Sequence, residues 1–288
     1  MGIDPTIEFI VPTYNQDALL RRAVASCLAV RGCSGVIVVD DGSQEPVDPD
    51  GFDDDRVRVV HQANAGPAAA RNNGLGLAKD RFICFCDSDD RVLPEIILTL
   101  ELMVRTGASV GCPNRIRVYA DGRERRLILP DAYRDALLPR PGAIFGVDEP
   151  IFGACGMIVD REQIGDLRFD ESLENGEDSD FMRRAGAFGG ICACDAPGTL
   201  ITRGRRDNQT GDARIDVIVS CFLDLMGRWY EDDDSSVWRH RLRAMAIKAA
   251  KHAKDDTTYP RVVAELTHRR WGVPLKARWA RVKRSVLR

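Results

Sequence analysis

Three carboxylates stand within four residues in the segment Asp87-Ser88-Asp89-Asp90. The segment follows an apolar run over residues 81–86, which predicts a buried strand that ends where the acidic side chains begin. Carboxylates packed this closely repel one another unless a divalent cation lies among them or water screens them. Oxygen ligands of this type suit Mg²⁺ or Mn²⁺, which commonly join a carboxylate to the phosphates of a substrate. The segment therefore indicates either a metal site or a solvated acidic turn.

Two more polar clusters follow apolar runs nearer the N-terminus. Pro12, Thr13 and Tyr14 end the run over residues 7–11, and Asp40 and Asp41 end the run over residues 35–39. Turn residues explain both clusters, since Pro, Asn and Gly favour turns. A carboxylate at such a position can also accept a hydrogen bond from a ring N–H of a nucleobase, and uracil offers that donor.

Glu177 and Asp178 stand at the start of a predicted short helix that runs to about residue 188. A hydroxyl group attacks poorly unless a carboxylate takes its proton in the transition state. A carboxylate at a helix start stays ionised easily, which suits that role. The alternative is that these acids only cap the helix.

Basic residues at three places are candidates for contact with an anion. Arg71 lies on a helix otherwise made of Ala, Asn, Gly and Leu, where it is either an exposed arginine or a ligand for phosphate. Arg203 and Arg206 belong to a basic, Gly-containing segment that is either a solvated loop or a cover over a ligand. Residues 269–288 carry basic side chains and two tryptophans without any acid, so they predict a helix on an anionic membrane or a helix packed on the domain.

The elements that must position these residues alternate between strand and helix. Strands are predicted at 7–11, 35–39, 57–61 and 81–86, and helices at 17–30, from 66 to about 79 and from 94 onward. Strands that are apolar throughout predict a parallel sheet covered on both faces, and such sheets bind ligands at the carboxyl ends of their strands. Further strands are predicted at 191–194 and 199–202, and the chain reads as helical from residue 213 onward.

Length and composition fit one large α/β domain, or one domain with a helical appendage, because the chain has 288 residues. A net charge of −3 argues against nucleic acid as the main partner. We find no apolar stretch of about 18 residues and no secretory signal. The nine cysteines lack the spacing of a zinc site and predict buried free thiols in a reducing cytoplasm.

The ordered set of motifs resembles glycosyltransferase family 2, whose members are inverting, nucleotide-sugar-dependent enzymes with the GT-A fold. The motifs are Val11-Pro12-Thr13-Tyr14-Asn15, Val39-Asp40-Asp41-Gly42-Ser43, Asn64-Ala65-Gly66-Pro67-Ala68-Ala69-Ala70-Arg71-Asn72, Asp87-Ser88-Asp89-Asp90, Gly153-Ala154-Cys155-Gly156-Met157 and Glu177-Asp178-Ser179-Asp180-Phe181. The resemblance covers about the first three quarters of the chain and points to the bacterial enzymes that build surface polysaccharides. It implies an α/β GT-A domain over residues 1–211, with a nucleotide-binding half (1–106), an acceptor-binding half (107–211) and a helical region at 212–288.

The resemblance also implies roles for single residues on the donor side. Thr13 and Tyr14, after Pro12, would frame the nucleobase, and Asp41 would accept a hydrogen bond from it. The resemblance places Arg71 at the base or phosphates. It places Asp87, beside Ser88, near the ribose and metal, with Asp89 as the direct metal ligand and Asp90 as its rival. Arg203 and Arg206 would lie at the diphosphate.

On the acceptor side the resemblance implies that Asp178 is the general base and that Glu177 faces the acceptor. The expected activity is a Mn²⁺- or Mg²⁺-dependent transfer from a nucleotide sugar, such as a UDP-sugar, to a hydroxyl of a carbohydrate or lipid-linked acceptor. The expected location is the cytoplasm, free or peripheral at the inner face of the membrane.

Two alternatives stay open. A sugar-nucleotide nucleotidyltransferase would carry a Gly-rich phosphate loop where residues 12–15 stand. A non-catalytic partner subunit would be expected to lose Asp41, Asp89 and Asp178, which are present here.

Overall fold

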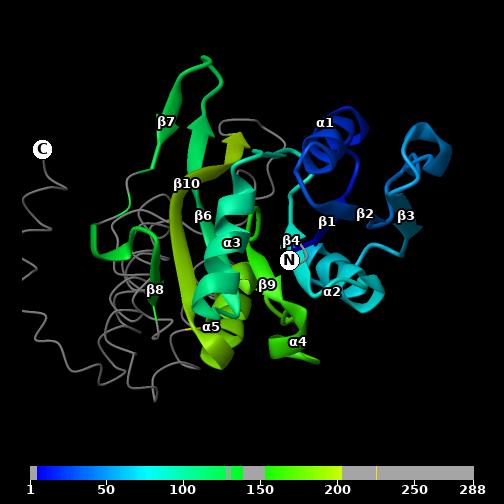
Figure 1. Ribbon diagram of the computed structural model, residues 1–288. Helices are drawn as coiled ribbons and strands as arrows, with labels where there is room; N and C mark the ends of the chain where they lie inside the picture. The colour runs from blue at the N-terminus through cyan, green and yellow to red at the C-terminus, as the bar shows by residue number, and fades with distance from the viewer. Residues whose placement is uncertain (1–4, 128, 130, 139–152, 203–224, 226–288) are drawn as a thin grey trace, which may run out of the picture.

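The apolar runs of the sequence form one ten-stranded sheet in the computed structural model of the chain (Figure 1). The structure describes residues 5–127, 129, 131–138, 153–202 and 225. The strands are β1 (Ile7–Thr13), β2 (Cys33–Asp40), β3 (Val57–His61), β4 (Phe82–Phe85), β5 (Arg91–Val92), β6 (Val110–Val118), β7 (Glu124–Arg126), β8 (Ala136–Leu138), β9 (Ile158–Asp160) and β10 (Ile191–Thr202). The helices are α1 (Asp17–Leu28), α2 (Pro67–Leu77), α3 (Ile96–Thr106), α4 (Arg161–Ile164) and α5 (Glu177–Gly189), with short 3-10 turns η1 (Pro49–Gly51) and η2 (Asp131–Tyr133).

The strand order is β3-β2-β1-β4-β9-β6-β10-β5, with β7 beside β6 and β8 beside β10. The first four strands along the sheet pair in parallel, and so do β6 and β10. β9 joins these two groups by antiparallel pairing with β4 and β6. The carboxyl ends of β1, β2 and β4 therefore meet at one edge, which is where the polar clusters of the sequence lie.

Each face of the sheet carries its own hydrophobic core, because alternate residues of a strand point to opposite faces. Helices α1 and α3 cover one face with Phe9 and Cys84, while α2, α4 and α5 cover the other with Ile10 and Phe85 (Figure 1). These residues have no measurable exposure, so the strands read as apolar throughout rather than alternating.

The predicted α/β class, with a central sheet flanked by helices, is confirmed. Two details differ from the sequence-based expectation. Residues 191–202 form one strand rather than two, since β10 continues past its polar middle by pairing with β6. Helix α3 begins at Ile96, two residues after Pro94. The predicted helical region at 212–288 lies outside the described residues except for Leu225, which is buried in the core.

No helix among the described residues is long and apolar enough to cross a membrane. The predicted burial of the thiols is confirmed for the eight cysteines that the structure describes, all of which are free and buried.

Candidate active site

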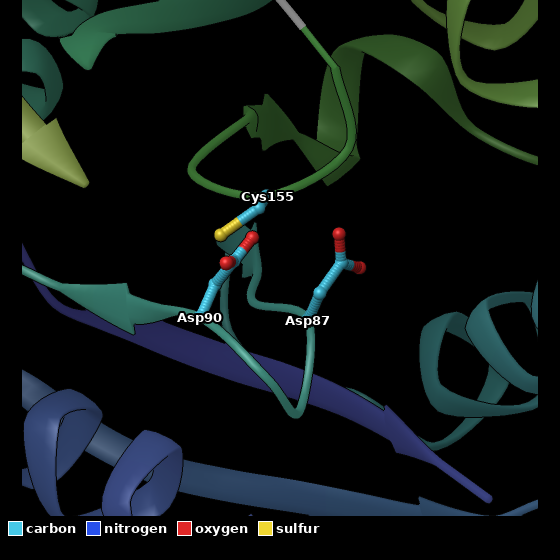
Figure 2. Close-up of side chains that lie close together, drawn as sticks. All are labelled: Asp87, Asp90 and Cys155. Atoms are coloured by element: carbon cyan, nitrogen blue, oxygen red, sulfur yellow. The ribbon is translucent and has the colours of Figure 1, made fainter. Parts of the chain in front are cut away.

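The acidic motif lies directly after β4, at the ligand-binding edge of the sheet. Asp87 is half-buried, whereas Asp90 is only 5% exposed. Figure 2 shows these two side chains pointing toward Cys155, and the ligand atoms of the three residues all lie within 4.8 Å of one another. Asp89 is half-buried and is not a member of this group. The structure thus brings Asp87 and Asp90 together, and it adds a cysteine that the sequence motifs did not single out as a neighbour of these acids.

The electrostatics of this group favour a cation. Burial, followed by the negative charges of Asp87 and Asp89, raises the pKa of Asp90 to about 8, although the Thr202 N–H and Arg115 oppose the shift. A hydrogen bond with Cys86, together with burial, raises the pKa of the Cys155 thiol well above its ordinary value. The carboxylates are therefore the hard oxygen donors that suit Mg²⁺ or Mn²⁺, while the thiol is not.

Arg71 on α2 links the acidic motif to the carboxylate pair at the start of α5. It is 5% exposed, and its Nη2 donates to Asp87 Oδ1 at 2.9 Å while its Nη1 donates to Glu177 Oε1 at 2.9 Å. Burial alone would lower the pKa of Arg71, but the charges of Asp87 and Glu177 outweigh it and raise the pKa above its usual range. The guanidinium carbon also lies 5.6 Å from the ring centre of Phe169. The arginine is buried rather than exposed, and it acts as the internal counter-ion of two carboxylates.

Asn72, the next residue on α2, fastens the loop that leads to α5. Its Oδ1 accepts from the backbone N–H of Phe169 at 2.8 Å, and its Nδ2 donates to the Phe169 carbonyl at 3.0 Å and to Glu171 Oε1 at 2.8 Å. The Phe169 ring stacks on Phe181 of α5 at 3.9 Å between centroids. Two consecutive residues of α2 therefore fix the start of α5 relative to the end of β4.

The pair Glu177 and Asp178 opens α5, as predicted. Burial and the neighbouring Asp178 charge raise the pKa of Glu177, while Arg71 opposes the shift. Asp178 is half-buried, and its Oδ1 accepts from the backbone N–H of Ser179 at 2.6 Å. Asp180 instead pairs with Arg184 on the same helix at 2.6 Å. No hydrogen bond or ion pair engages Asp178 Oδ2 among the described residues.

The polar cluster after β2 is tied to the loop before α2. The Asp41 carboxylate accepts from Gln62 Nε2 at 2.8 Å and from the backbone N–H groups of Ala65 and Gly66 at 2.9 and 2.8 Å. The Gly66 N–H, at the start of α2, is thus used by a side chain of the protein itself. Asp41 organises the entry to α2 whatever else it contacts.

Asp40 and the end of β1 complete this region. Burial would raise the pKa of Asp40, but hydrogen bonds from Ser43, Val47 and His61 outweigh it and lower the pKa. Thr13 is 4% exposed, and its Oγ1 has no hydrogen-bond partner in the described part of the chain. Tyr14, beside it, is 40% exposed. A buried hydroxyl without a partner next to an exposed ring suits a site that a ligand completes.

The end of β10 reaches the acidic motif from the other half of the domain. The Thr202 N–H donates to Asp90 Oδ1 at 2.8 Å, and its hydroxyl donates to the Asp89 carbonyl at 3.2 Å. Arg203 and Arg206 lie outside the described residues, but the segment that carries them starts at this point. The sequence did not indicate Thr202, because a contact 112 residues away along the chain leaves no local pattern.

A second residue that the sequence motifs did not reveal is Arg115 on β6. It is 7% exposed, and its Nη2 donates to the carbonyls of Gly153 and Cys155 at 2.9 and 3.2 Å. The local sequence indicated Arg115 only as a charged residue within a segment that forms the interior strand β6.

The chain is similar in sequence to two bacterial proteins. It is 34% identical over 231 residues to the succinoglycan biosynthesis protein ExoO of Rhizobium meliloti, a match that covers 74% of this chain and 65% of that protein. It is 30% identical over 192 residues to the glycosyltransferase EpsJ of Bacillus subtilis, covering 62% of this chain and 55% of that protein. The chain thus spans less than two thirds of the length of these curated relatives.

Two solved structures share the fold. Staphylococcus aureus TarS 1–349 in complex with UDP-GlcNAc superimposes with a TM-score of 0.67 at 17% identity, over 91% of this chain and 79% of that one. The mannosyltransferase PcManGT of Pyrobaculum calidifontis, in complex with GDP-Man and Mn²⁺, does so with a TM-score of 0.58 at 16% identity, over 99% and 81% of the two chains.

The family model described as Glycosyl transferase family 2 matches residues 8–158. The matched region runs from β1 to the first residue of β9 and includes the ends of β1, β2 and β4 with their acidic side chains. Because the matched region holds the strand ends that build this site, the chain belongs to glycosyl transferase family 2.

Proposed function

We propose that the chain transfers a sugar from a nucleotide sugar, a UDP-sugar in the first instance, to a hydroxyl of a carbohydrate or lipid-linked acceptor during polysaccharide biosynthesis. The observation that carries the proposal is the bridge of Arg71 between Asp87 and Glu177, which fixes a donor-side acidic motif beside an acceptor-side carboxylate pair. The polysaccharide-related name of the Rhizobium relative and the nucleotide sugars bound to the two structural neighbours support it.

The nucleoside would bind over the ends of β1 and β2. Thr13 offers a buried hydroxyl without a partner, and Tyr14 offers an exposed ring for stacking. Asp41 Oδ2 accepts one hydrogen bond, from the Gly66 N–H, and could accept a second from the edge of the nucleobase, since each carboxylate oxygen can take two. Pro12 and Ser88, which flank these positions at the ends of β1 and β4, would shape the floor of the site.

A divalent cation, Mn²⁺ or Mg²⁺, would be held by the carboxylates after β4. Asp87 and Asp90 converge, and Asp89 stands between them in the chain and is half-buried. When bound, the cation would offset the negative charge that gathers on the diphosphate leaving group. The raised pKa of Asp90 supports the fit, because it reflects crowded carboxylates that lack enough positive charge around them.

Asp178 would act as the general base. Its Oδ2, which no described residue engages, would take the proton of the acceptor hydroxyl while the hydroxyl oxygen bonds to the anomeric carbon and the nucleoside diphosphate leaves with the electron pair of the broken bond. Glu177 is held by Arg71 and is not free to serve as a nucleophile, which favours a single displacement with inversion.

Arg203 and Arg206 would approach the diphosphate, since their segment begins where Thr202 meets Asp89 and Asp90. The basic residues 269–288 would give peripheral contact with an anionic membrane from the cytoplasmic side. Such contact would suit a lipid-linked acceptor.

The test is to incubate the protein with a panel of UDP- and GDP-sugars and measure release of nucleoside diphosphate, with and without Mn²⁺. Wild type should release UDP from at least one donor. Asp89→Ala should lose metal-dependent UDP binding, whereas Asp178→Asn should bind UDP normally and lose about 10²-fold or more in turnover. Normal turnover by Asp178→Asn would remove the base assignment, and release of pyrophosphate from a nucleoside triphosphate would favour a nucleotidyltransferase.

A further inference from the structure

Arg115 is a buried cation without an ion-pair partner among the described residues, although its charge opposes the rise that burial causes in the pKa of Asp90. It lies on the interior strand β6 and is 7% exposed. Its Nη2 donates only to the carbonyls of Gly153 and Cys155, its Nε has no hydrogen-bond partner, and no described carboxylate forms an ion pair with it. A buried charge that meets only backbone carbonyls is costly to maintain. Packing alone would be served equally well by an apolar side chain of similar size.

The two carbonyls that Arg115 holds belong to one turn, Gly153–Gly156, which touches both sides of the candidate site. Through Cys155 the turn meets Asp87 and Asp90 (Figure 2). Through Gly153 it meets Asp178, because a Cβ on Gly153 would lie only 3.1 Å from Asp178 Oδ2. The turn therefore stands between the acidic motif and the proposed base.

Gly153 is the place where Arg115 and Asp178 come together. The same hypothetical Cβ would lie 3.1 Å from Arg115 Nη1, so Nη1 and Asp178 Oδ2 are separated by no more than twice that distance. They are nevertheless too far apart for an ion pair, which requires 4.0 Å or less. Only a residue without a side chain leaves this gap open.

The β6–β10 ladder is irregular where it carries Arg115. The register of the β6–β10 ladder shifts on either side of Pro197, next to the pair Arg115–Thr199. The Arg115 N–H is bonded to the side-chain oxygen of Asn114 at 2.7 Å, and Asn114 has no measurable exposure. Irregularities of this kind re-aim side chains and are common beside active sites.

We propose that Arg115 is a positioning residue for Asp178, acting through the turn Gly153–Gly156, and that Gly153 is required for their approach. The other charged groups that face Asp178 are Glu177, which has the same sign, and Arg71, which already donates to Asp87 and Glu177. Among the described residues, Arg115 is thus the remaining cation near Asp178 Oδ2. The inference rests on the proposed function, in which that oxygen takes the acceptor proton.

The experiment compares Arg115→Met, Arg115→Lys and Gly153→Ala, each alone and combined with Asp178→Asn. Turnover is measured as release of nucleoside diphosphate from the nucleotide sugar that wild type uses, and affinity as Mn²⁺-dependent UDP binding by calorimetry. Arg115→Met should lower kcat by about 10- to 100-fold, the scale of a misplaced catalytic group, with UDP affinity within about twofold of wild type. Arg115→Lys should recover part of the loss, since it keeps the charge.

Gly153→Ala keeps the arginine and should lower kcat in the same way, so it serves if Arg115→Met does not fold. Arg123→Met is the control, because Arg123 is an exposed arginine beside β7 that pairs with Asp121, and it should change neither quantity. In the Asp178→Asn background, Arg115→Met should lower kcat by less than about a further twofold, because the effects of residues that act as a unit are not additive.

Two results would overturn the inference while sparing the proposed function. One is a full multiplicative loss in the double variant, which would show that Arg115 acts independently of Asp178. The other is normal turnover in both Arg115→Met and Gly153→Ala while Asp178→Asn is impaired. Normal turnover in Asp178→Asn would instead overturn the base assignment itself.

Discussion

Replacing Arg71 with methionine removes the one side chain in the described part of the chain that bonds to both Asp87 and Glu177. Methionine fills a similar volume but carries no charge and no hydrogen-bond donor. The two carboxylates would then face each other across a buried space without their shared counter-ion. We expect the variant to be much less stable than wild type at neutral pH.

The magnitude follows from the burial of each partner. Breaking a buried ion pair costs about 3–5 kcal/mol of unfolding free energy when the charge left behind stays buried. The Glu177 side chain is 14% exposed and remains largely dry, whereas Asp87 is 33% exposed and regains some water. We therefore expect about 3 kcal/mol, or a fall in Tm on the order of 10 °C for a domain of this size.

The pH dependence of this loss has a defined sign. Glu177 has a folded-state pKa above its ordinary value of 4.5, so its contribution to stability declines as pH rises beyond that value. Without Arg71 the decline becomes steeper, because the cation that opposed the shift is gone. The stability deficit of Arg71→Met should thus be smaller at pH 5 than at pH 8.

The assay is chemical denaturation followed by circular dichroism at both pH values. Arg31→Met is the matched control: Arg31 pairs with Glu101 at 2.7 Å, but the two side chains are 65% and 45% exposed. An exposed pair of this kind contributes about 0.5 kcal/mol. Equal losses in the two variants, or a deficit in Arg71→Met that ignores pH, would refute the reasoning.

Three further predictions concern the acidic motif, the proposed nucleobase site at Asp41, and residues 269–288. Asp90→Asn keeps the acceptor for the Thr202 N–H but loses a carboxyl whose pKa is raised to about 8, so its gain in Tm over wild type should grow as pH rises from 5 to about 8; a gain that does not change with pH would contradict this. Asp41→Ala should lower affinity for UDP more than for pyrophosphate in titration calorimetry, and should also lower Tm, because its carboxylate holds the Ala65 and Gly66 N–H groups; equal affinity losses would argue against base contact. Deleting residues 269–288 should reduce co-sedimentation with anionic vesicles, as high salt should; a full-length protein that ignores such vesicles at low salt would show that these residues do not bind membranes.

Local patterns were enough to predict the frame of this fold. An apolar run that stops at Asp87 or at Asp40 marks the carboxyl end of a buried strand, and the parallel pairing of β1, β2 and β4 then places those ends together. The start of α5 at Glu177 was also predicted from a local pattern, because acidic residues before a periodic apolar pattern indicate a helix start.

The contacts between distant segments could not be predicted in this way. The ion pairs of Arg71 with Asp87 and Glu177 were not predicted, because an arginine on a helix carries no sign of which carboxylates it will meet. Arg115, Cys155 and Thr202 reach the site only through the pairing of β6, β9 and β10, and that pairing is decided by packing over the whole sheet. The sequence shows which strands end in acids, and tertiary structure decides which cations neutralise them.

Because the described cysteines are buried, their reactivity can be used to measure local opening of the structure. The eight described thiols are all buried, so a thiol reagent in solution can reach them only when the surrounding structure opens. With Cys221, which lies outside the described residues, replaced by serine, labelling rates followed by mass spectrometry would rank the regions of the sheet by how often they open. Cys155 would report on the acidic motif, and Cys112 on the core at the opposite face of the sheet, so the effect of a nucleotide on each could be followed without an added probe.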